Sequence, residues 1–333
     1  MKTKIICTIG PATETEEVLN KLIDAGMGVA RCNFSHGSHE EHKAKFDKFK
    51  KIREERGIDL PIMLDTKGPD VRIKRFKDGK VVLNKGQKFN FYTEDRVGDE
   101  NGVSVTHDGL TKYVKVGDMI FLGDGFMQCK ITNVHDSVIE SEVINGGKLS
   151  DNKAVAVTGV DVGLPFMREA DIIDLKFGVE QNVDMIGASF VNSADDVRAV
   201  RKIVGPKIKI IAKIETGKGV ANIDEILKEA DGVMVARGGL GTNEPLSKLP
   251  IFQKKILAAA KKHNKFSIVA TEMMDSMINN ARPTRAEVLD VFNAVVDGAS
   301  AVMFSGETAI GSWPVEAVKM MASIAEQAEG YIS

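Results

Sequence analysis

The sequence predicts an α/β protein: a (β/α)8 TIM barrel with a small all-β barrel domain inserted after its third strand. Three observations predict this fold. Short apolar runs alternate with helical patterns along most of the chain. There are eight such runs, the number that closes a barrel. One long interval, between the third and fourth runs, carries short alternating strands instead. A doubly wound sheet has the same local pattern, but the count of eight favours the barrel.

The eight apolar runs are nearly continuous in hydrophobicity, as strands buried on both faces require. They are Lys4–Ile9, Gly28–Asn33, Pro61–Asp65, Met185–Phe190, Ile208–Ile214, Gly232–Arg237, Ser267–Thr271 and Ala301–Ser305. Helical periodicity covers the segments Glu16–Ala25, Glu40–Glu55, Ala194–Val204, Asn222–Ala230, Ile251–Asn264, Ala286–Asp297 and Val315–Ala328. Capping-box patterns at Thr13–Glu16, Ser38–Glu41 and Thr284–Glu287 predict where three of these helices begin.

The long interval predicts an independent domain of short strands separated by turn signals such as Asp78-Gly79 and Asp124-Gly125. Its predicted strands are Val71–Lys74, Lys80–Leu83, Phe89–Tyr92, Val103–Thr106, Met119–Leu122, Cys129–Thr132 and Val138–Ser141. We therefore expect residues 1–69 and 161–333 to form the barrel and residues 70–160 to form the inserted domain. An insertion in a loop that follows a barrel strand lies at the mouth where active sites are built, so this domain is a candidate lid.

Composition excludes several classes of protein. The 333 residues are 43% hydrophobic and 28% charged, which excludes disordered and disulfide-scaffold chains. Forty-five Lys and Arg against 47 Asp and Glu give a net charge of -2, so no overall field attracts nucleic acid or an anionic membrane. Cys7, Cys32 and Cys129 lie in apolar runs and are expected to be buried, reduced thiols. Without a membrane-spanning stretch or a signal peptide, the sequence predicts a cytoplasmic protein.

Charged side chains gather where the predicted strands end, and parallel strands bring these ends to one mouth. The cations are Arg31, Arg72, Lys213 and Arg237, and the carboxylates are Asp65, Glu215, Glu272 and Glu307. Cations neutralise phosphate or carboxylate oxygens, and carboxylates bind hard metal ions, so a phosphate with a hard cation is the simplest joint interpretation. Lys213 and Glu215 face the same side of their strand and could instead form a structural ion pair, but buried charge favours function.

Other motifs at these strand ends allow two interpretations. His36, His39 and His42 could bind a metal, but no Cys or carboxylate spacing supports zinc, so solvated histidines are favoured. Met273, Met274 and Met277 are spaced for one helical face and predict core packing. The glycines Gly238, Gly239 and Gly241 predict either a tight turn or an anion-binding turn, and the sequence does not choose between them.

Seven motifs together resemble the pyruvate kinase family. They are Thr3–Ala12 (TKIICTIGPA), Asn33–Gly37 (NFSHG), Leu64–Pro69 (LDTKGP), Asp174–Gly178 (DLKFG), Ala212–Glu215 (AKIE), Arg282–Glu287 (RPTRAE) and Ser305–Thr308 (SGET). They come in the order and at the spacing of the family, and the resemblance covers nearly the whole chain. It does not extend to the family's C-terminal domain.

The resemblance implies transfer of a phosphoryl group from phosphoenolpyruvate to ADP, a step of glycolysis, with Mg2+ (or Mn2+) and K+ as cofactors. It implies that Arg31, Lys213 and Thr271 are catalytic and that Gly238 and Gly239 join them in binding substrate. By the same similarity Glu215 holds magnesium, while potassium is held by Asn33, Ser35, Asp65 and Thr66. Nucleotide binding falls to Arg72, His36 and Lys153, and Asp124 resembles a further lid position. The implied partners are these small molecules and other copies of the chain, through barrel helices.

Several residues depart from the family pattern. The family has Asp where this chain has Gly239, so one carboxylate ligand of magnesium is missing. Glu272 replaces a Gln, and Lys153–Gly159 and Thr242–Leu246 also differ. Magnesium commonly uses one or two protein carboxylates with substrate phosphates, so Glu215 alone could still hold it more weakly. Three functions follow: a pyruvate kinase with weakened or altered metal use, an enzyme of other enolate chemistry (lyase, aldol or decarboxylase type), or a non-catalytic phosphoenolpyruvate-binding protein.

Overall fold

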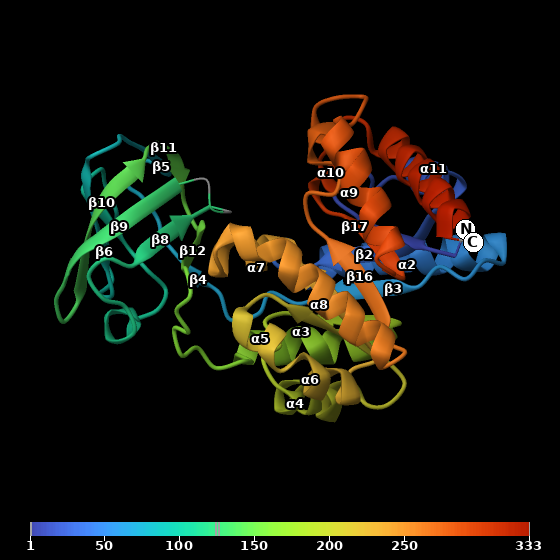
Figure 1. The fold of residues 1–333 in the computed structure, drawn as a ribbon, viewed down its shortest axis with the longest axis horizontal. Coiled ribbons are helices and arrows are strands. Elements are labelled where there is room, and N and C mark those ends of the chain that lie inside the picture. Colours follow the sequence, from blue (N-terminus) through green and yellow to red (C-terminus); the bar gives the residue numbers. More distant parts are fainter. Residues whose placement is uncertain (1, 124, 126, 333) are drawn as a thin grey trace. The chain divides into compact units, whose positions relative to one another are not determined.

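The structure is a computed structural model that describes residues 2–123, 125 and 127–332. Asp124, one of the residues with a predicted role, lies outside the described residues. The chain divides into two compact units (Figure 1). The barrel unit comprises Met1–Gly68, Phe166–Gly238 and Pro250–Ser333, and the β unit comprises Pro69–Pro165 and Gly239–Leu249. The segment Gly239–Leu249 follows a barrel strand in sequence but is grouped with the β unit.

Eight parallel strands close a barrel within the described part of the chain, in the order β1-β17-β16-β15-β14-β13-β3-β2. The predicted (β/α)8 fold is thus confirmed. The strands are β1 (Lys4–Thr8), β2 (Met27–Asn33), β3 (Ile62–Asp65), β13 (Met185–Ala188), β14 (Lys209–Ile214), β15 (Gly232–Ala236), β16 (Phe266–Ala270) and β17 (Ala301–Phe304). Each lies within two residues of its predicted limits. One buried cluster contains side chains from all eight strands, including Ile6, Met63, Ile211 and Met303, which explains the continuous apolar runs.

Helices follow most of these strands. They are α1 (Glu16–Asp24), α2 (His39–Arg56), α3 (Glu169–Glu180), α4 (Ala194–Val204), α5 (Gly217–Ala221), α6 (Ile223–Glu229), α7 (Arg237–Asn243), α8 (Leu249–Lys262), α9 (Arg285–Val296), α10 (Gly306–Ala309) and α11 (Pro314–Ile332). Short 3-10 turns lie at η2 (Leu246–Lys248) and η3 (Asp275–Ile278). The prediction omitted α3, because this helix buries Asp171 and Asp174 and lacks a clean apolar stripe. None of the described helices is long and apolar enough to cross a membrane.

Two of the three predicted capping boxes are confirmed. Ser38 caps α2 with Glu41, and Thr284 caps α9 with Glu287. The prediction at Thr13 was wrong: α1 is capped by Thr15, while the buried Thr13 hydroxyl donates to the carbonyl of Thr308 at 2.8 Å. The local pattern was present, but a tertiary hydrogen bond uses the hydroxyl instead.

The β unit has an all-β inserted segment, Pro69–Pro165, as predicted, and also contains most of α7 and η2 in Gly239–Leu249. Its strands are β4 (Val71–Arg72), β5 (Lys80–Leu83), β6 (Lys88–Tyr92), β7 (Gly102–Ser104), β8 (Met119–Leu122), β9 (Met127–Val134), β10 (Val138–Asn145), β11 (Gly147–Ser150) and β12 (Ala154–Val157), with a 3-10 turn η1 (Leu110–Lys112). In the described residues they form a seven-stranded sheet, β4-β12-β8-β9-β10-β6-β7, and a two-stranded sheet, β11-β5. An antiparallel bridge between Ile73 and Val105 joins the segments that follow β4 and β7, so the two edges of the larger sheet meet there.

The register of the barrel strands brings distant residues together at their carboxyl ends. Asp65 in β3 pairs with Asn33 in β2 and with Gly187 in β13. Ala236 in β15 pairs with Ala270 in β16, so Arg237 and Thr271 begin neighbouring turns. The cysteines are buried and free, as predicted. Parallel strands in register therefore place the predicted site residues of the barrel unit on one rim.

Candidate active site

Asp65 is the centre of a buried cluster of charges at the ends of β2, β3 and β14. One carboxylate oxygen accepts from Arg31 Nε at 2.6 Å, and the other accepts from Lys213 Nζ at 2.7 Å. Asp65 is fully buried, and Arg31 and Lys213 are 7% and 9% exposed. Buried charges persist when they are paired, so this geometry explains how two cations stay at the end of an apolar barrel.

Glu215 lies beside this cluster, directly after β14. Its Oε1 is 3.3 Å from Lys213 Nζ but makes no hydrogen bond with any described residue, although the atom is buried. Buried polar atoms almost always have partners, and exceptions mark sites of strain, catalysis or an absent ion. Lys213 and Glu215 therefore form an ion pair through Oε1, but this oxygen makes no hydrogen bond and can still accept a further cation or donor.

The pKa values follow from burial and from these neighbours. Burial alone raises the pKa of Asp65, but the charges of Arg31 and Lys213 outweigh it and hold the pKa below its ordinary value. Burial disfavours the Lys213 ammonium, yet Asp65 and Glu215 raise the pKa of Lys213 above its ordinary value. Burial raises the pKa of Glu215, although Lys213 opposes the rise. Lys213 is thus a permanent cation beside a carboxylate that gains from any added cation.

Hydroxyl groups hold the charged side chains in place. Lys213 Nζ donates to Ser189 Oγ at 2.5 Å, and that hydroxyl donates to the carbonyl of Thr66 at 2.7 Å. The amide of Ser189 donates to Thr66 Oγ1 at 3.1 Å. Arg31 Nη1 donates to Thr8 Oγ1 at 2.7 Å. No individual role is predicted for Ser189 or Thr8 from the sequence, because an isolated hydroxyl carries no signal without its tertiary partners.

Asn33 is the last residue of β2, and Ser35 and His36 lie in the loop that follows. Asn33 Oδ1 accepts from the amide of Ser35 at 3.1 Å, and the carbonyl of His36 accepts from His42 Nε2 at 2.8 Å. Asn33 ends β2 beside Asp65, which ends β3, and Thr66 follows Asp65, whose oxygens already accept from two cations. The four predicted potassium ligands thus come from two adjacent turns of the barrel.

The prediction of solvated histidines was wrong for His42. This ring is 3% exposed and stacks on Phe34 with a centroid distance of 3.9 Å. Burial lowers the pKa of His42, which keeps the ring neutral. His39 is partly exposed and bonds to the buried Asp174 at 2.6 Å. The helix start is not an exposed face, because α3, the helix missed in the sequence, packs against it through Asp174 and Phe177.

Thr271 lies at the end of β16, in a turn with unusual backbone angles. Thr271 and Glu272 have φ values of 78° and 53°, and a Cβ on Gly238 would lie 3.1 Å from Thr271 Cγ2. The Thr271 side chain thus packs on the backbone of Gly238, and the structure brings these two predicted substrate-binding residues together. This close approach explains why a glycine stands at position 238, in addition to any need for a tight turn.

Arg237 was predicted to neutralise phosphate or carboxylate oxygens of a ligand, and the structure assigns its donors elsewhere. Its guanidinium donates to the carbonyls of Thr271 and Glu272 and forms an ion pair with Asp290 at 2.7 Å. Adjacent turns in register bring these groups together. The planar guanidinium therefore serves the backbone of the neighbouring turn.

Two of the predicted oxygen ligands also have other surroundings. Glu307 is buried, and its oxygens accept from the amides of Met274 and Ser305 at 3.1 and 2.8 Å. Burial raises the pKa of Glu307 more than these bonds lower it. The Glu272 side chain is exposed. Met273, Met274 and Met277 are buried as predicted, but they lie in this turn and in η3, not on one α-helical face.

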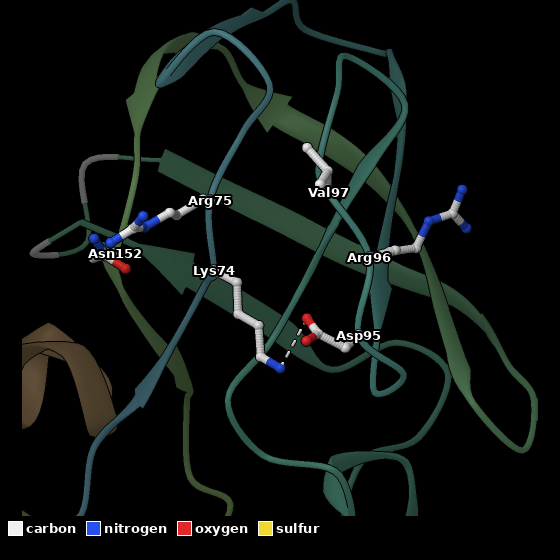
Figure 2. Close-up of a pocket in the computed structure, with 6 residues that line it drawn as sticks. All are labelled: Lys74, Arg75, Asp95, Arg96, Val97 and Asn152. Carbon is white, nitrogen blue, oxygen red and sulfur yellow. Dashed lines mark hydrogen bonds and ion pairs between the residues drawn. The ribbon is translucent and has the colours of Figure 1, made fainter.

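Arg72 and Lys153 belong to the β unit, where β4 pairs with β12 and Lys153 directly precedes β12. Arg72 forms an ion pair with Asp70 at 2.6 Å and donates to the carbonyl of Asn152 at 2.9 Å. Lys74, two residues after Arg72, and Asn152, next to Lys153, line a pocket of about 440 Å3. The other lining residues are Arg75, Asp95, Arg96 and Val97 (Figure 2). Lys74 pairs with Asp95 at 3.1 Å, and Arg96 lies over the ring of Tyr92, so much of the positive charge is already engaged.

The described residues contain no group of three or more His, Cys, Asp or Glu side chains that could hold a metal ion. Within the charged cluster, Glu215 Oε1, which makes no hydrogen bond with a described residue, is the group that fits a divalent cation. Gly239 contributes no side chain, and its carbonyl accepts from Thr242 Oγ1 at 3.0 Å. The donor set is therefore a single carboxylate that needs ligand oxygens to complete a hard cation's shell.

Comparisons with known proteins agree with the fold. The family model described as "Pyruvate kinase, barrel domain" matches residues 1–318. The chain is 46% identical over 333 residues to a pyruvate kinase of Chlamydia trachomatis serovar D, covering 98% of this chain and 68% of the relative. It is 47% identical to a pyruvate kinase of Sporosarcina psychrophila over 99% of this chain and 58% of that protein. A pyruvate kinase of Clostridium perfringens (strain 13 / Type A) is 46% identical over 98% of the chain and 70% of the relative.

Proposed function

Because this chain belongs to the pyruvate kinase family, and is thus a phosphotransferase of that type, we propose that it converts phosphoenolpyruvate and ADP to pyruvate and ATP. One observation carries the proposal for this particular chain. Arg31, Asp65, Lys213 and Glu215 form one buried cluster, in which two cations and a carboxylate oxygen without a hydrogen bond lie together at the barrel mouth. A phosphorylated acid and a hard cation complement these charges.

Arg31 and Lys213 are the groups we propose for the transferred phosphoryl group. Phosphoryl transfer needs fixed positive charge where negative charge is redistributed, and a preorganised site supplies it without reorganisation. Asp65 keeps both side chains oriented, and the raised pKa of Lys213 keeps the ammonium charged throughout the neutral range. Lys213 would stabilise the group in flight, and Arg31 would hold the phosphate oxygens.

Glu215 is the proposed protein ligand of magnesium or manganese, because its buried Oε1 lacks a hydrogen-bond partner among the described residues. The cation supplies charge stabilisation for the phosphate oxygens when it is bound. Asn33, Ser35, Asp65 and Thr66 are the proposed oxygen donors for potassium. The Asp65 oxygens already serve two cations, which fits an electrostatic contribution at that position.

Thr271 and the backbone amides of Gly238 and Gly239 are the proposed site for the substrate carboxylate. The contact between the Thr271 side chain and Gly238 supports this assignment. Arg72, His36 and Lys153 are proposed for the nucleotide. The role of the β unit as a lid, association through barrel helices and a cytoplasmic location stay predictions from the sequence.

An assay with the purified full chain tests the function. Protein is mixed with phosphoenolpyruvate, K+ and either Mg2+ or Mn2+, and pyruvate is followed with and without ADP. Pyruvate that depends on ADP is the expected result. Turnover without ADP would show other enolate chemistry, and saturable binding without product would show a non-catalytic binding protein; either result would contradict the proposal.

Two lysines of β14 provide a matched pair of variants for this assay. Lys213→Met removes the buried ammonium and is expected to abolish ADP-dependent turnover. Lys209→Met changes an exposed lysine of the same strand and is expected to leave turnover unchanged. Equal activity in both variants would contradict the role assigned to Lys213.

Gly239 accounts for the proposed difference in metal use. Losing one carboxylate ligand is expected to weaken divalent-cation affinity by at least about 10-fold. Gly239→Asp is therefore expected to tighten Mn2+ binding, measured by titration, and to raise the rate at low metal concentration. Unchanged Mn2+ affinity in this variant would show that position 239 does not limit metal binding.

A further inference from the structure

The turn after β16 has a backbone conformation that its residues rarely adopt. Among the described non-glycine residues, positive φ angles occur at Asn152, Asn182, Phe190, Asn264, Thr271 and Glu272. Asn tolerates this region, whereas a β-branched residue such as Thr271, with φ of 78°, is an outlier. Two consecutive residues in this conformation persist only when their surroundings determine it, and such strain gathers at functional sites.

Arg237, at the end of the neighbouring strand, holds these two residues in their conformation. Its Nε and Nη2 donate to the carbonyl of Thr271 at 3.0 and 2.6 Å, and Nη2 also lies 3.1 Å from the carbonyl of Glu272. Its Nη1 pairs with Asp290 of α9 at 2.7 Å. The Arg237 side chain is 12% exposed, so these bonds are largely shielded from water. One rigid group thus binds both strained peptide carbonyls and is itself fixed by a helix.

Two carboxylates hold the next residues of the same turn. Glu307 accepts from the amide of Met274 at 3.1 Å, and Glu287 accepts from the amide and hydroxyl of Ser276 at 2.8 and 2.5 Å. Residues 271–276 are therefore tied to α7, α9 and α10 by charged side chains. Neither the strain nor the bonds are needed to continue the barrel, because the strand has already ended at Ala270.

We infer that Arg237 and Asp290 are positioning residues: they hold Thr271 in its left-handed conformation, with its side chain against Gly238, and so orient its hydroxyl toward the substrate carboxylate. No hydrogen bond of that hydroxyl is found among the described residues. The inference rests on the proposed function, which places Thr271 and Gly238 in the substrate site. It changes the role of Arg237 from a ligand-binding cation to a support for the turn.

Arg237→Lys tests the inference, because lysine keeps the charge but lacks the planar fork that reaches two carbonyls and Asp290. The dissociation constants of phosphoenolpyruvate and of ADP are measured separately by calorimetry in the presence of Mg2+ and K+. We expect the constant for phosphoenolpyruvate to rise at least about 10-fold, since small misplacements at a site have effects of this size. The constant for ADP is expected to stay the same. Asp290→Asn is expected to shift the first constant in the same direction by less.

Arg201 offers a matched control elsewhere in the barrel unit. Its guanidinium likewise donates to two backbone carbonyls, of Gly205 and Ile208, at 2.9 and 2.7 Å, and pairs with Asp231. Both Arg201→Lys and Arg237→Lys are expected to lower the melting temperature, but Arg201→Lys is expected to change neither dissociation constant. A rise in the dissociation constant of phosphoenolpyruvate in both variants would show a general loss of structure and would overturn the positioning role.

A rescue variant and a structure separate the remaining outcomes. Glycine adopts positive φ without strain, so adding Glu272→Gly to Arg237→Lys is expected to restore part of the affinity for phosphoenolpyruvate. Unchanged affinity in Arg237→Lys would overturn the inference. If the unaltered protein binds no phosphoenolpyruvate, the proposed function fails. The crystal structure of Arg237→Lys then decides the positioning role: a Thr271 φ that becomes negative supports it, and a φ still near 78° overturns it.

Discussion

The charged cluster around Asp65 and the turn after β16 lie at carboxyl ends of strands of the same barrel, but they are held in different ways. In the cluster, opposite charges orient one another, and the backbone is ordinary strand. In the turn, a charged side chain orients the backbone, and the functional group is an uncharged hydroxyl. A group that must remain charged is fixed by its counter-ion, whereas a neutral group has no such partner and is placed by the conformation of its own peptide.

The largest expected effect is on the stability of the charged cluster. Asp65→Asn leaves Arg31 and Lys213 buried without their shared counter-charge, and breaking a buried pair typically costs about 3–5 kcal/mol. We expect a loss of this order in the free energy of unfolding, measured with denaturant. Asp47→Asn, which breaks the exposed pair between Lys43 and Asp47, is the control and is expected to change little. Equal stability of the two variants would contradict the account of the cluster.

The stability difference between the unaltered protein and Asp65→Asn is expected to depend on pH. The pKa of Asp65 is lower in the folded state than its ordinary value of about 3.9, so its contribution to stability is complete above that value. The contribution is lost as pH falls through the lowered, folded pKa. The difference in unfolding free energy between the unaltered protein and Asp65→Asn is expected to be constant at neutral pH and to shrink below about pH 4. A difference that grows in acid would have the wrong sign.

The next effect concerns the turn after β16. Glu307→Ala leaves the amides of Met274 and Ser305 without their acceptor, and an unsatisfied buried donor costs about 1–3 kcal/mol. Because the buried carboxylate is itself unfavourable, we expect a net loss of about 2 kcal/mol in unfolding free energy. Glu307→Gln retains one acceptor and is expected to lose less. Stability equal to that of the unaltered protein in Glu307→Ala would show that the turn is fixed without Glu307.

A smaller effect is expected at the loop after β2. This loop is held by a neutral hydrogen bond, not by an ion pair or by a charged side chain bonded to the backbone. His42→Phe keeps a ring to stack on Phe34 but removes the donor to the carbonyl of His36. The expected loss is about 1 kcal/mol, the usual net value of such a bond, with faster amide hydrogen exchange in residues 34–37. His42→Gln restores a donor and is expected to slow that exchange again. Unchanged exchange in His42→Phe would show that the loop is held by other contacts.

The smallest effect has the opposite sign and tests whether the backbone of the turn after β16 is strained. Glu272→Gly removes the strain of a φ of 53° at an exposed side chain, and the flexible unfolded chain offsets part of this gain, so stability should rise by less than about 1 kcal/mol. Asn264→Gly, at a φ of 51°, is the control, and a smaller gain is expected because Asn tolerates this region. Thermal unfolding measures both. A clear loss of stability at position 272 would mean that the turn is not strained.

Much of the barrel could be predicted from the sequence, because the information is local. Continuous apolar runs mark strands buried on both faces, and eight of them specify a closed barrel. Ser38 and Thr284 capped their helices as their neighbours in sequence predicted. Two predictions failed where a tertiary partner competed. The Thr13 hydroxyl bonds to the carbonyl of Thr308 instead of capping a helix. His42 is buried because α3 packs nearby, and the apolar periodicity of α3 is concealed in the sequence by its buried Asp174.

The sequence by itself determined the order of strands and the residue types that reach the barrel rim, since alternation of strand and helix and the chemistry of Lys, Arg, Asp and Glu are properties of short segments. Only the tertiary structure decided which of these charges meet. It joined Arg31 and Lys213 through Asp65, left Glu215 Oε1 without a hydrogen bond among the described residues, and turned Arg237 onto the backbone of Thr271. The physical reason is that burial and pairing depend on the register between strands far apart in the chain, and no local pattern specifies which buried groups become neighbours.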